Sequence, residues 1–429
     1  MNTAKPATLG RFLIYLGIAV AATVPAIALR ASGWRPNALL DAGLFGAAIL
    51  AAGFMLSWGA ETAEKRVSQG LIVAAIALVT VLPEYAVDFY YAYAAGQAPN
   101  SNYVHYAAAN MTGANRLLVG LAWPLMVILH WLRTRQRRID LAPVNAAEIM
   151  FLMIGTAWSF TILVRDAIGW IDSVVLVGIF AAYVWRVSYL PKAEEDEDDE
   201  PGPAAALGRL PPARQWLAMG GLTIVSAAVI LASAEPFAES MVASGRLIGI
   251  DEFLLIQWLA PLASEAPAVT IAVLFVLSGR AANGLATMIS DKINQWTLLV
   301  GMLPLAMSLG AGGLTALPLD ARQHEEFLLT AAQSLFGIAL LLRLRLGLWG
   351  GLALAALFAA QVGLTLAFLG DEARTVASLT WLSWAYLALA AAVLAANARR
   401  LGHLFLTGLF ASHPAVHRGG EPPLGGAKA

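Results

Sequence analysis

Apolar segments about as long as a bilayer is thick follow one another along almost the whole chain. A membrane-spanning helix needs about 20 predominantly apolar residues, and about twelve such segments are expected here, from 11–31 to 379–397. Charged residues make up only 13% of the 429 residues, whereas soluble domains carry about 25%. The sequence therefore predicts an all-α polytopic membrane protein without a soluble catalytic domain.

Two local features narrow this class further. The segment 11–31 also fits a signal peptide, but its length and the span that follows at once favour a transmembrane helix. The absence of cysteine excludes disulfides, zinc–thiolate sites and thiol chemistry. His403, His413 and His417 lie near the C-terminus and are more typical of a solvated tail than of a metal site.

Lys and Arg residues are unevenly divided between the two ends of the expected spans. The positive-inside rule places the richer side in the cytoplasm, so both basic termini and the acidic linker 191–214 are expected there, in a cell inner (plasma) membrane. The six on the poorer side are Arg30, Arg35, Arg165, Arg246, Arg322 and Arg374. The thirteen on the richer side are Lys65, Arg66, Arg133, Arg135, Arg137, Arg138, Arg186, Lys192, Arg209, Arg214, Arg280, Arg343 and Arg345.

One stretch of the chain occurs twice. Subtracting 181 aligns residues 260–301 on 79–120 without a gap, and both copies end in Leu-Leu-Val-Gly. This places Glu265 on Glu84 and Asp291 on Asn110. The two glutamates lie in the third and eighth expected spans, an odd separation, so these spans cross in opposite directions. The duplication therefore predicts an inverted repeat.

A glutamate lies in the middle of each copy. An ionised carboxylate in the hydrocarbon core costs at least about 2.5 kcal/mol, so such residues bind an ion, titrate or form a pair. Proline removes a backbone N–H and frees a carbonyl, so Pro83 and the prolines around Glu265 predict broken helices whose oxygens can ligate a cation. The alternative is that the glutamates cap helix breaks or pair with a buried arginine. Asp88 lies one turn beyond Glu84 on the same helix face.

Further oxygen-bearing residues surround the two glutamates in sequence. Asn110 and Asp291 each follow their glutamate by 26 residues, and hard oxygen ligands of this kind suit Na⁺ or Ca²⁺. Interhelical hydrogen bonding accounts equally well for each secondary candidate taken singly. These secondary candidates are Thr80, Asn115, Ser290, Asn294 and Gln295.

Arg116 and Lys292 are fixed cations within the same stretches. Each would oppose a mobile cation, or occupy a place that an ion fills elsewhere. Alternatively, Arg116 pairs with Asp88 or Glu84. We therefore treat both residues as charge-modulating.

The two stretches resemble the repeats of the cation/calcium exchanger superfamily. Residues 79–84 (Val-Thr-Val-Leu-Pro-Glu) resemble its Gly-Thr-Ser-Leu-Pro-Glu motif, and 109–115 resemble its Gly-Asn segment; 260–265 and 289–295 are the second copy. The resemblance implies two inverted five-helix repeats, here with one extra helix at each end. The expected boundaries are 1–36 (extra helix), 37–190 (first repeat), 191–214 (linker), 215–370 (second repeat) and 371–429 (extra helix and tail). It also implies that Glu84 and Glu265 are the central ligands for Ca²⁺ or Na⁺.

Some motif positions differ from the family pattern. Val81 replaces the usual serine, Pro261 and Leu262 stand where threonine and serine are expected, and Lys292 replaces a neutral residue. Fewer neutral ligands and an added cation favour exchange of H⁺ or Na⁺ against one cation over a site for several Na⁺ ions plus Ca²⁺.

The sequence thus predicts a secondary active cation antiporter rather than an enzyme. The bilayer and inorganic cations are its expected partners, with no nucleic acid, no cofactor beyond transported Na⁺, H⁺ or Ca²⁺, and the oligomeric state open. One alternative is a transport-inactive scaffold whose carboxylates Arg116 and Lys292 neutralise. An ion channel is a third interpretation.

Overall fold

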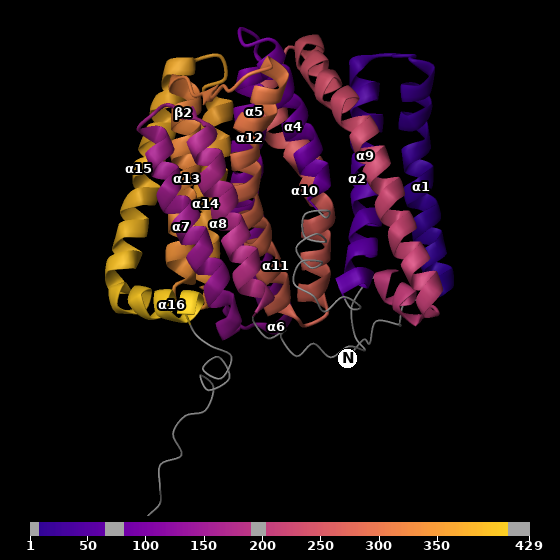
Figure 1. The fold of residues 1–429 in the computed structure, drawn as a ribbon. Coiled ribbons are helices and arrows are strands. Elements are labelled where there is room, and N and C mark those ends of the chain that lie inside the picture. Colours follow the sequence, from indigo (N-terminus) through magenta and orange to yellow (C-terminus); the bar gives the residue numbers. More distant parts are fainter. Residues whose placement is uncertain (1–7, 65–80, 190–202, 411–429) are drawn as a thin grey trace, which may run out of the picture.

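Long helices run roughly side by side and make up most of the described part of the chain (Figure 1). The computed structural model describes residues 8–64, 81–189 and 203–410. Within these ranges, nine helices are long and apolar enough to cross a membrane. The predicted all-α polytopic architecture is therefore confirmed in its main feature.

The helices of the first half follow the expected apolar segments. A π-helical turn, η1, joins α5 to α6 without interrupting their course. The elements are α1 (Leu9–Ser32), α2 (Ala38–Glu64), α4 (Leu82–Gln97), α5 (Tyr103–Leu117), η1 (Leu118–Ala122), α6 (Trp123–Thr134), β1 (Arg138–Asp140), η2 (Pro143–Asn145), α7 (Ala146–Leu163), β2 (Ala167–Ile168) and α8 (Trp170–Ser188).

The second half repeats this order, including a second π-helical turn, η4, between α11 and α12. Its elements are η3 (Pro203–Arg209), α9 (Pro212–Ile248), α10 (Glu252–Leu277), α11 (Ala281–Asn294), η4 (Gln295–Leu299), α12 (Val300–Ala311), β3 (Leu317–Pro318), α13 (Ala321–Leu341), β4 (Arg345–Gly347), α14 (Leu348–Ala367), α15 (Glu372–Ala396) and α16 (Ala398–Phe410).

Three details differ from the expectations. The apolar segment 215–234 predicts a helix that ends at Ala234, but α9 continues through Pro236 to Ile248 because it packs along α2 and α4. The tail begins with a helix, α16, which packs on α7 and buries Leu404. Short strands, unexpected in an all-α chain, occur in the loops.

The two proline-bearing helices also differ from each other. α4 begins at Leu82, so Pro83 occupies its first turn, where a helix needs no N–H from it. The carbonyl that Pro83 would free belongs to Val79, outside the described residues. α10, by contrast, is helical throughout and contains both Pro261 and Pro267, so the predicted break beside Glu265 is not observed.

The helices that carry the two glutamates run in opposite directions. Tyr106, near the start of α5, contacts Glu252 at the start of α10. Gly96, at the end of α4, lies against the backbone of Met307 and Ala311 at the end of α12. Since a short turn joins α4 to α5, α4 ends at the side of the molecule where α10 begins.

Two small antiparallel ribbons join the halves of the chain. β1 pairs with β4, so the segment after α6 meets the segment after α13. β2 pairs with β3, so the segment after α7 meets the segment after α12. The two ribbons lie at opposite ends of the bundle, because the helix α7 runs from β1 to β2.

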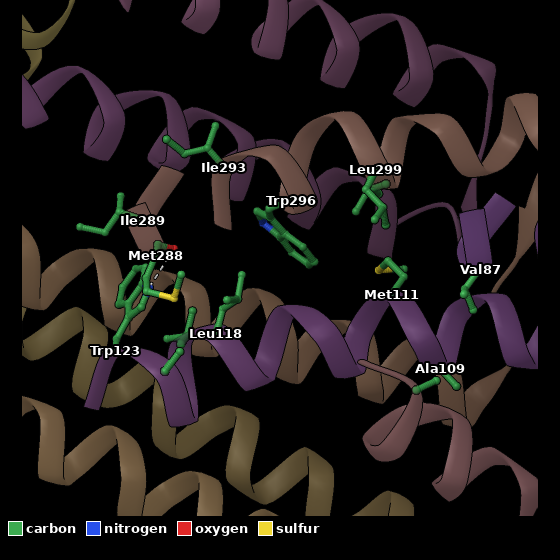
Figure 2. Packing of buried hydrophobic residues seen from close by; sticks show 14 of the residues in the cluster. Val87, Ala109, Met111, Leu118, Trp123, Met288, Ile289, Ile293, Trp296 and Leu299 are labelled. Carbon is green, nitrogen blue, oxygen red and sulfur yellow. Dashed lines mark hydrogen bonds between the residues drawn. The ribbon is translucent and has the colours of Figure 1, made fainter. Parts of the chain in front are cut away.

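Helices of both halves pack around the same core. α1, α2 and α9 form one side of the molecule (Figure 1), and α2 and α9 contact α10 and α4 in turn. Figure 2 shows how residues of both copies interleave: Trp123 donates a hydrogen bond to the Met288 carbonyl at 3.2 Å, and Trp296 lies near Met111 and Leu118. The duplicated stretches are therefore packed against each other.

One loop contact fixes the start of α13. Asp320 caps this helix by accepting a hydrogen bond from the Gln323 amide at 2.8 Å. His105 of α5 lies 3.2 Å from the other Asp320 oxygen, and this contact holds the pKa of the Asp320 carboxyl below its usual range.

Candidate functional site

Glu84 and Glu265 meet at the centre of the bundle. Both are buried, and the Gln295 side-chain amide bridges them. Its Nε2 donates to Glu84 Oε2 at 2.8 Å and also to Glu265 Oε1. The glutamates come from α4 and α10, and Gln295 is the first residue of the π-helical turn η4. Three elements, drawn from both halves of the chain, thus place polar side chains at one point.

Local structure favours a negative charge at Glu84. Pro83 fixes the first turn of α4 and places Glu84 in that turn. The unpaired N–H groups and the dipole of a helix N-terminus stabilise anions there. Next to Glu265, the Ser264 hydroxyl donates a hydrogen bond to the Pro261 carbonyl at 3.2 Å and so is satisfied within α10.

Two aspartates add to the negative charge of this region. Asp88 is fully buried, and neither of its carboxylate oxygens has a hydrogen-bond partner among the described residues. Asp291 is half-buried, and both aspartates lie close enough to interact electrostatically with Glu84 and Glu265. Buried charges require compensation, and bound cations or protons would supply it. In the part of the chain that the structure describes, no three of these groups converge tightly enough to hold a metal ion by themselves.

The remaining expected ligands lie at different distances from this centre. Asn110 is buried near Asp88, and its Oδ1 has no partner in the described part of the chain. Asn115 points elsewhere, since its Oδ1 accepts from Lys292 Nζ at 2.7 Å. Ser290 and Asn294 bond the tyrosine hydroxyls of Tyr183 and Tyr85, respectively. Thr80 lies outside the described residues.

The two fixed cations do not pair with the central glutamates. Arg116 forms a buried ion pair with Glu326 of α13, rather than with Asp88 or Glu84. Lys292 lies between Asn115 and the ring of Trp296, 4.3 Å from its centroid. Among the described ion pairs, none joins either cation to Glu84 or Glu265.

Sequence reasoning missed Glu326. The only signal was an acidic pair, Glu325-Glu326, at the start of an apolar segment. Such a pair is indistinguishable from solvated residues at a helix end, because the sequence does not say that α13 begins deep enough to bury one of them.

The comparisons with solved structures define the class of this fold. The chain is similar to the H⁺/Ca²⁺ exchanger CAX, with 38% identity and a TM-score of 0.85 over 93% of this chain and 98% of that one. Native YfkE (13% identity, TM-score 0.57, 81% and 97% covered) and the sodium-calcium exchanger NCX_Mj (18%, 0.51, 76% and 99%) share the fold. The fold is that of a membrane cation exchanger.

The family follows from the sequence itself. The profile of the sodium/calcium exchanger protein family matches residues 38–189 and 219–367. The chain belongs to this family, a family of transporters rather than enzymes, and the resemblance of its repeats to the cation/calcium exchanger superfamily is confirmed. No curated protein matches the chain.

Proposed function

We propose that this protein is a secondary active antiporter that exchanges H⁺ for a divalent cation such as Ca²⁺. The observation that carries the proposal is the meeting of Glu84 and Glu265 at Gln295 from oppositely directed helices. The similarity to an H⁺/Ca²⁺ exchanger over 93% of the chain supports this choice of ions.

The chemistry of two carboxyl groups balances such an exchange. When a divalent cation binds, each glutamic acid releases one proton to the solution, and the two carboxylates match the charge of the ion. On the other side of the membrane the cation leaves and each carboxylate takes up one proton. The centre is then neutral in both forms, so the exchange transfers two protons against one divalent cation.

The architecture that we propose has two inverted repeats. Residues 37–190 and 215–370 form the repeats, 1–36 and 371–429 contribute the extra helices, and the linker 191–214 joins the repeats in the cytoplasm. The opposite directions of α4 and α10 support this arrangement. Alternate exposure of the centre would then follow from rocking of one group of helices against the other.

Flux into proteoliposomes tests the function. We expect Ca²⁺ uptake driven by an imposed pH gradient, and a loss of at least about tenfold in Glu84→Gln and in Glu265→Gln, equivalent to about 1.4 kcal/mol. Glu325→Gln is the matched control, because this half-buried glutamate of α13 is not among the residues that bond or interact electrostatically with Glu84 and Glu265. A Na⁺ gradient in place of the pH gradient distinguishes the coupling ion.

Two results would contradict the proposal. Uptake in wild type no greater than in the Gln variants would favour the transport-inactive scaffold. Uptake that continues without any counter-ion gradient and carries current would favour a channel.

A further inference from the structure

A cavity of about 470 Å³ lies at the end of the bundle where α4 ends and α5 and α10 begin. Its walls include Tyr103 and Tyr106 of α5 and Glu239 and Arg246 of α9. Glu239 is exposed and accepts a hydrogen bond from the Tyr90 hydroxyl at 2.9 Å. A divalent cation with six to eight waters, at about 30 Å³ each, occupies roughly 180–240 Å³, so the cavity has room for a hydrated ion.

Glu239 is the carboxylate of this cavity that lacks a cationic partner among the described ion pairs. Arg246, the cation in the wall, bonds Glu252 at 2.6 Å. One helical turn before Glu239, Glu235 forms an ion pair with Arg30, also at 2.6 Å. Because Glu252, just outside the wall, neutralises Arg246, the Glu239 carboxylate leaves one negative charge at the cavity, and this charge attracts cations from solution.

Two facing stripes of side chains connect the cavity to the central glutamates. On α4, Glu84, Asp88 and Tyr91 follow one another at helical spacing. On α5, the facing stripe begins at the cavity wall and ends at Asn110. The Tyr91 ring lies 6.1 Å from that of Tyr106, measured between centroids, and so joins the stripes below the cavity.

Polar atoms without partners lie along this route. Both carboxylate oxygens of Asp88 and the Oδ1 of Asn110 are buried, and none of them has a hydrogen-bond partner in the described residues. Buried polar atoms are almost always hydrogen-bonded to protein or to ordered water. Where no protein partner is present, an internal water molecule usually supplies the hydrogen bond. These oxygens mark a place between the cavity and the centre that suits water or a cation.

The corresponding face of the second half has no such stripe. Adding 181 to Asp88 and Tyr91 gives Val269 and Ala272 of α10. Ala272 is fully buried, and its carbonyl lies against Gly284 of α11, 2.6 Å from where a Cβ would be. The route is therefore a property of the first half alone and leads to one end of the molecule.

We propose that this cavity is a docking site for hydrated divalent cations, with Glu239 as the docking carboxylate, and that Asp88 and Asn110 relay the ion to the central glutamates. The proposal rests on the proposed antiporter function. By the distribution of Lys and Arg, the cavity faces away from the cytoplasm.

Flux measured from each side of the membrane tests it. In Glu239→Gln, we expect the KM for Ca²⁺ on the cavity side to rise about fivefold, with Vmax and the KM on the other side unchanged. Glu235→Gln is the matched control, on the same helix one turn away and outside the cavity wall. Because the chain has no cysteine, Asn100→Cys in the exposed turn before α5 reports orientation through an impermeant maleimide.

Binding of Tb³⁺ gives a readout independent of transport. This Ca²⁺ substitute luminesces when neighbouring tyrosines are excited, so Glu239→Gln should reduce the emission while Glu235→Gln should not. Suppose that wild type exchanges ions, and that Glu239→Gln has the same KM on both sides and the same Tb³⁺ emission as wild type. The docking proposal is then wrong, while the proposed antiporter function is unaffected. An equal loss of Vmax from both sides in Glu239→Gln would also contradict the docking proposal. A wild-type protein without flux would instead contradict the proposed antiporter function.

Discussion

At the scale of single residues, the buried pair Arg116–Glu326 is open to a direct test. Both side chains are almost wholly inaccessible, and Arg116 also lies over the Trp258 ring, 5.4 Å from its centroid. Breaking a buried ion pair by removing one partner costs about 3–5 kcal/mol, whereas replacing both by apolar residues is often neutral. We expect Arg116→Met and Glu326→Leu each to lower the Tm in detergent strongly, and the double variant to recover most of the loss.

The double variant also separates structure from ion chemistry. If Arg116 acts only through Glu326, the double variant should retain the Ca²⁺ KM of wild type. A stable Arg116→Met single variant would contradict the pairing, and a changed KM in the double variant would show that the guanidinium charge reaches the central glutamates.

The sequence predicted the central residues better than their neighbours. Glu84 and Glu265 stand out because a carboxylate in an apolar segment is costly and because the duplication repeats it. In the sequence, Gln295 was one of several amide side chains that were equally plausible as ligands. Only its position at the start of η4 in the structure distinguishes it from the others. The Lys292–Asn115 contact joins two helices from different halves, and sequence spacing does not say which helix faces which.

At the scale of helices, a glycine sets the approach of α5 to α10. Pro261 has no N–H, so the Gln257 carbonyl lacks its usual partner within α10. Gly113 of α5 lies directly against this carbonyl, and a Cβ at Gly113 would clash with it. We expect Gly113→Ala to lower the Tm and to reduce flux, because separating the helices by overpacking costs about 1–3 kcal/mol.

Gly178 of α8 provides the matched control for this change. A Cβ at Gly178 would meet nothing within 4 Å, and alanine is a better helix former than glycine by about 1 kcal/mol. Gly178→Ala should therefore leave the Tm unchanged or raise it. Equal Tm values for Gly113→Ala and wild type would show that α5 and α10 have more freedom than this contact implies.

Helix ends were the least predictable part of the fold. The Glu235-Pro236 pair looks like a helix end in sequence, yet α9 continues for another three turns beside α2 and α4. The prolines of α10 likewise suggested a break that is not observed. In both cases contacts with neighbouring helices outweigh a local signal, and a single sequence contains no measure of those contacts.

At the scale of the whole molecule, the two ribbons show which parts are tied together. β1 with β4, and β2 with β3, connect the loops that follow α6, α7, α12 and α13. In the described chain no strand joins α1, α2 or α9 to the other helices. This division suits a motion in which α1, α2 and α9 move as a group against the remaining helices, whose loops the two ribbons connect at both ends of the bundle.

A cross-link in the first ribbon tests this division. Asp140 and Arg345 are register partners on β1 and β4, and Cα atoms of paired strands lie about 4.5–5.5 Å apart, within the range of a disulfide. In this cysteine-free chain, we expect Asp140→Cys with Arg345→Cys to cross-link on oxidation and to keep at least about half of the flux, because both strands belong to the same bundle. Each single cysteine variant with oxidant is the control. Flux that disappears on oxidation and returns with a reductant would mean that the halves separate at this ribbon during exchange, and that the moving boundary runs between α6 and α13 instead.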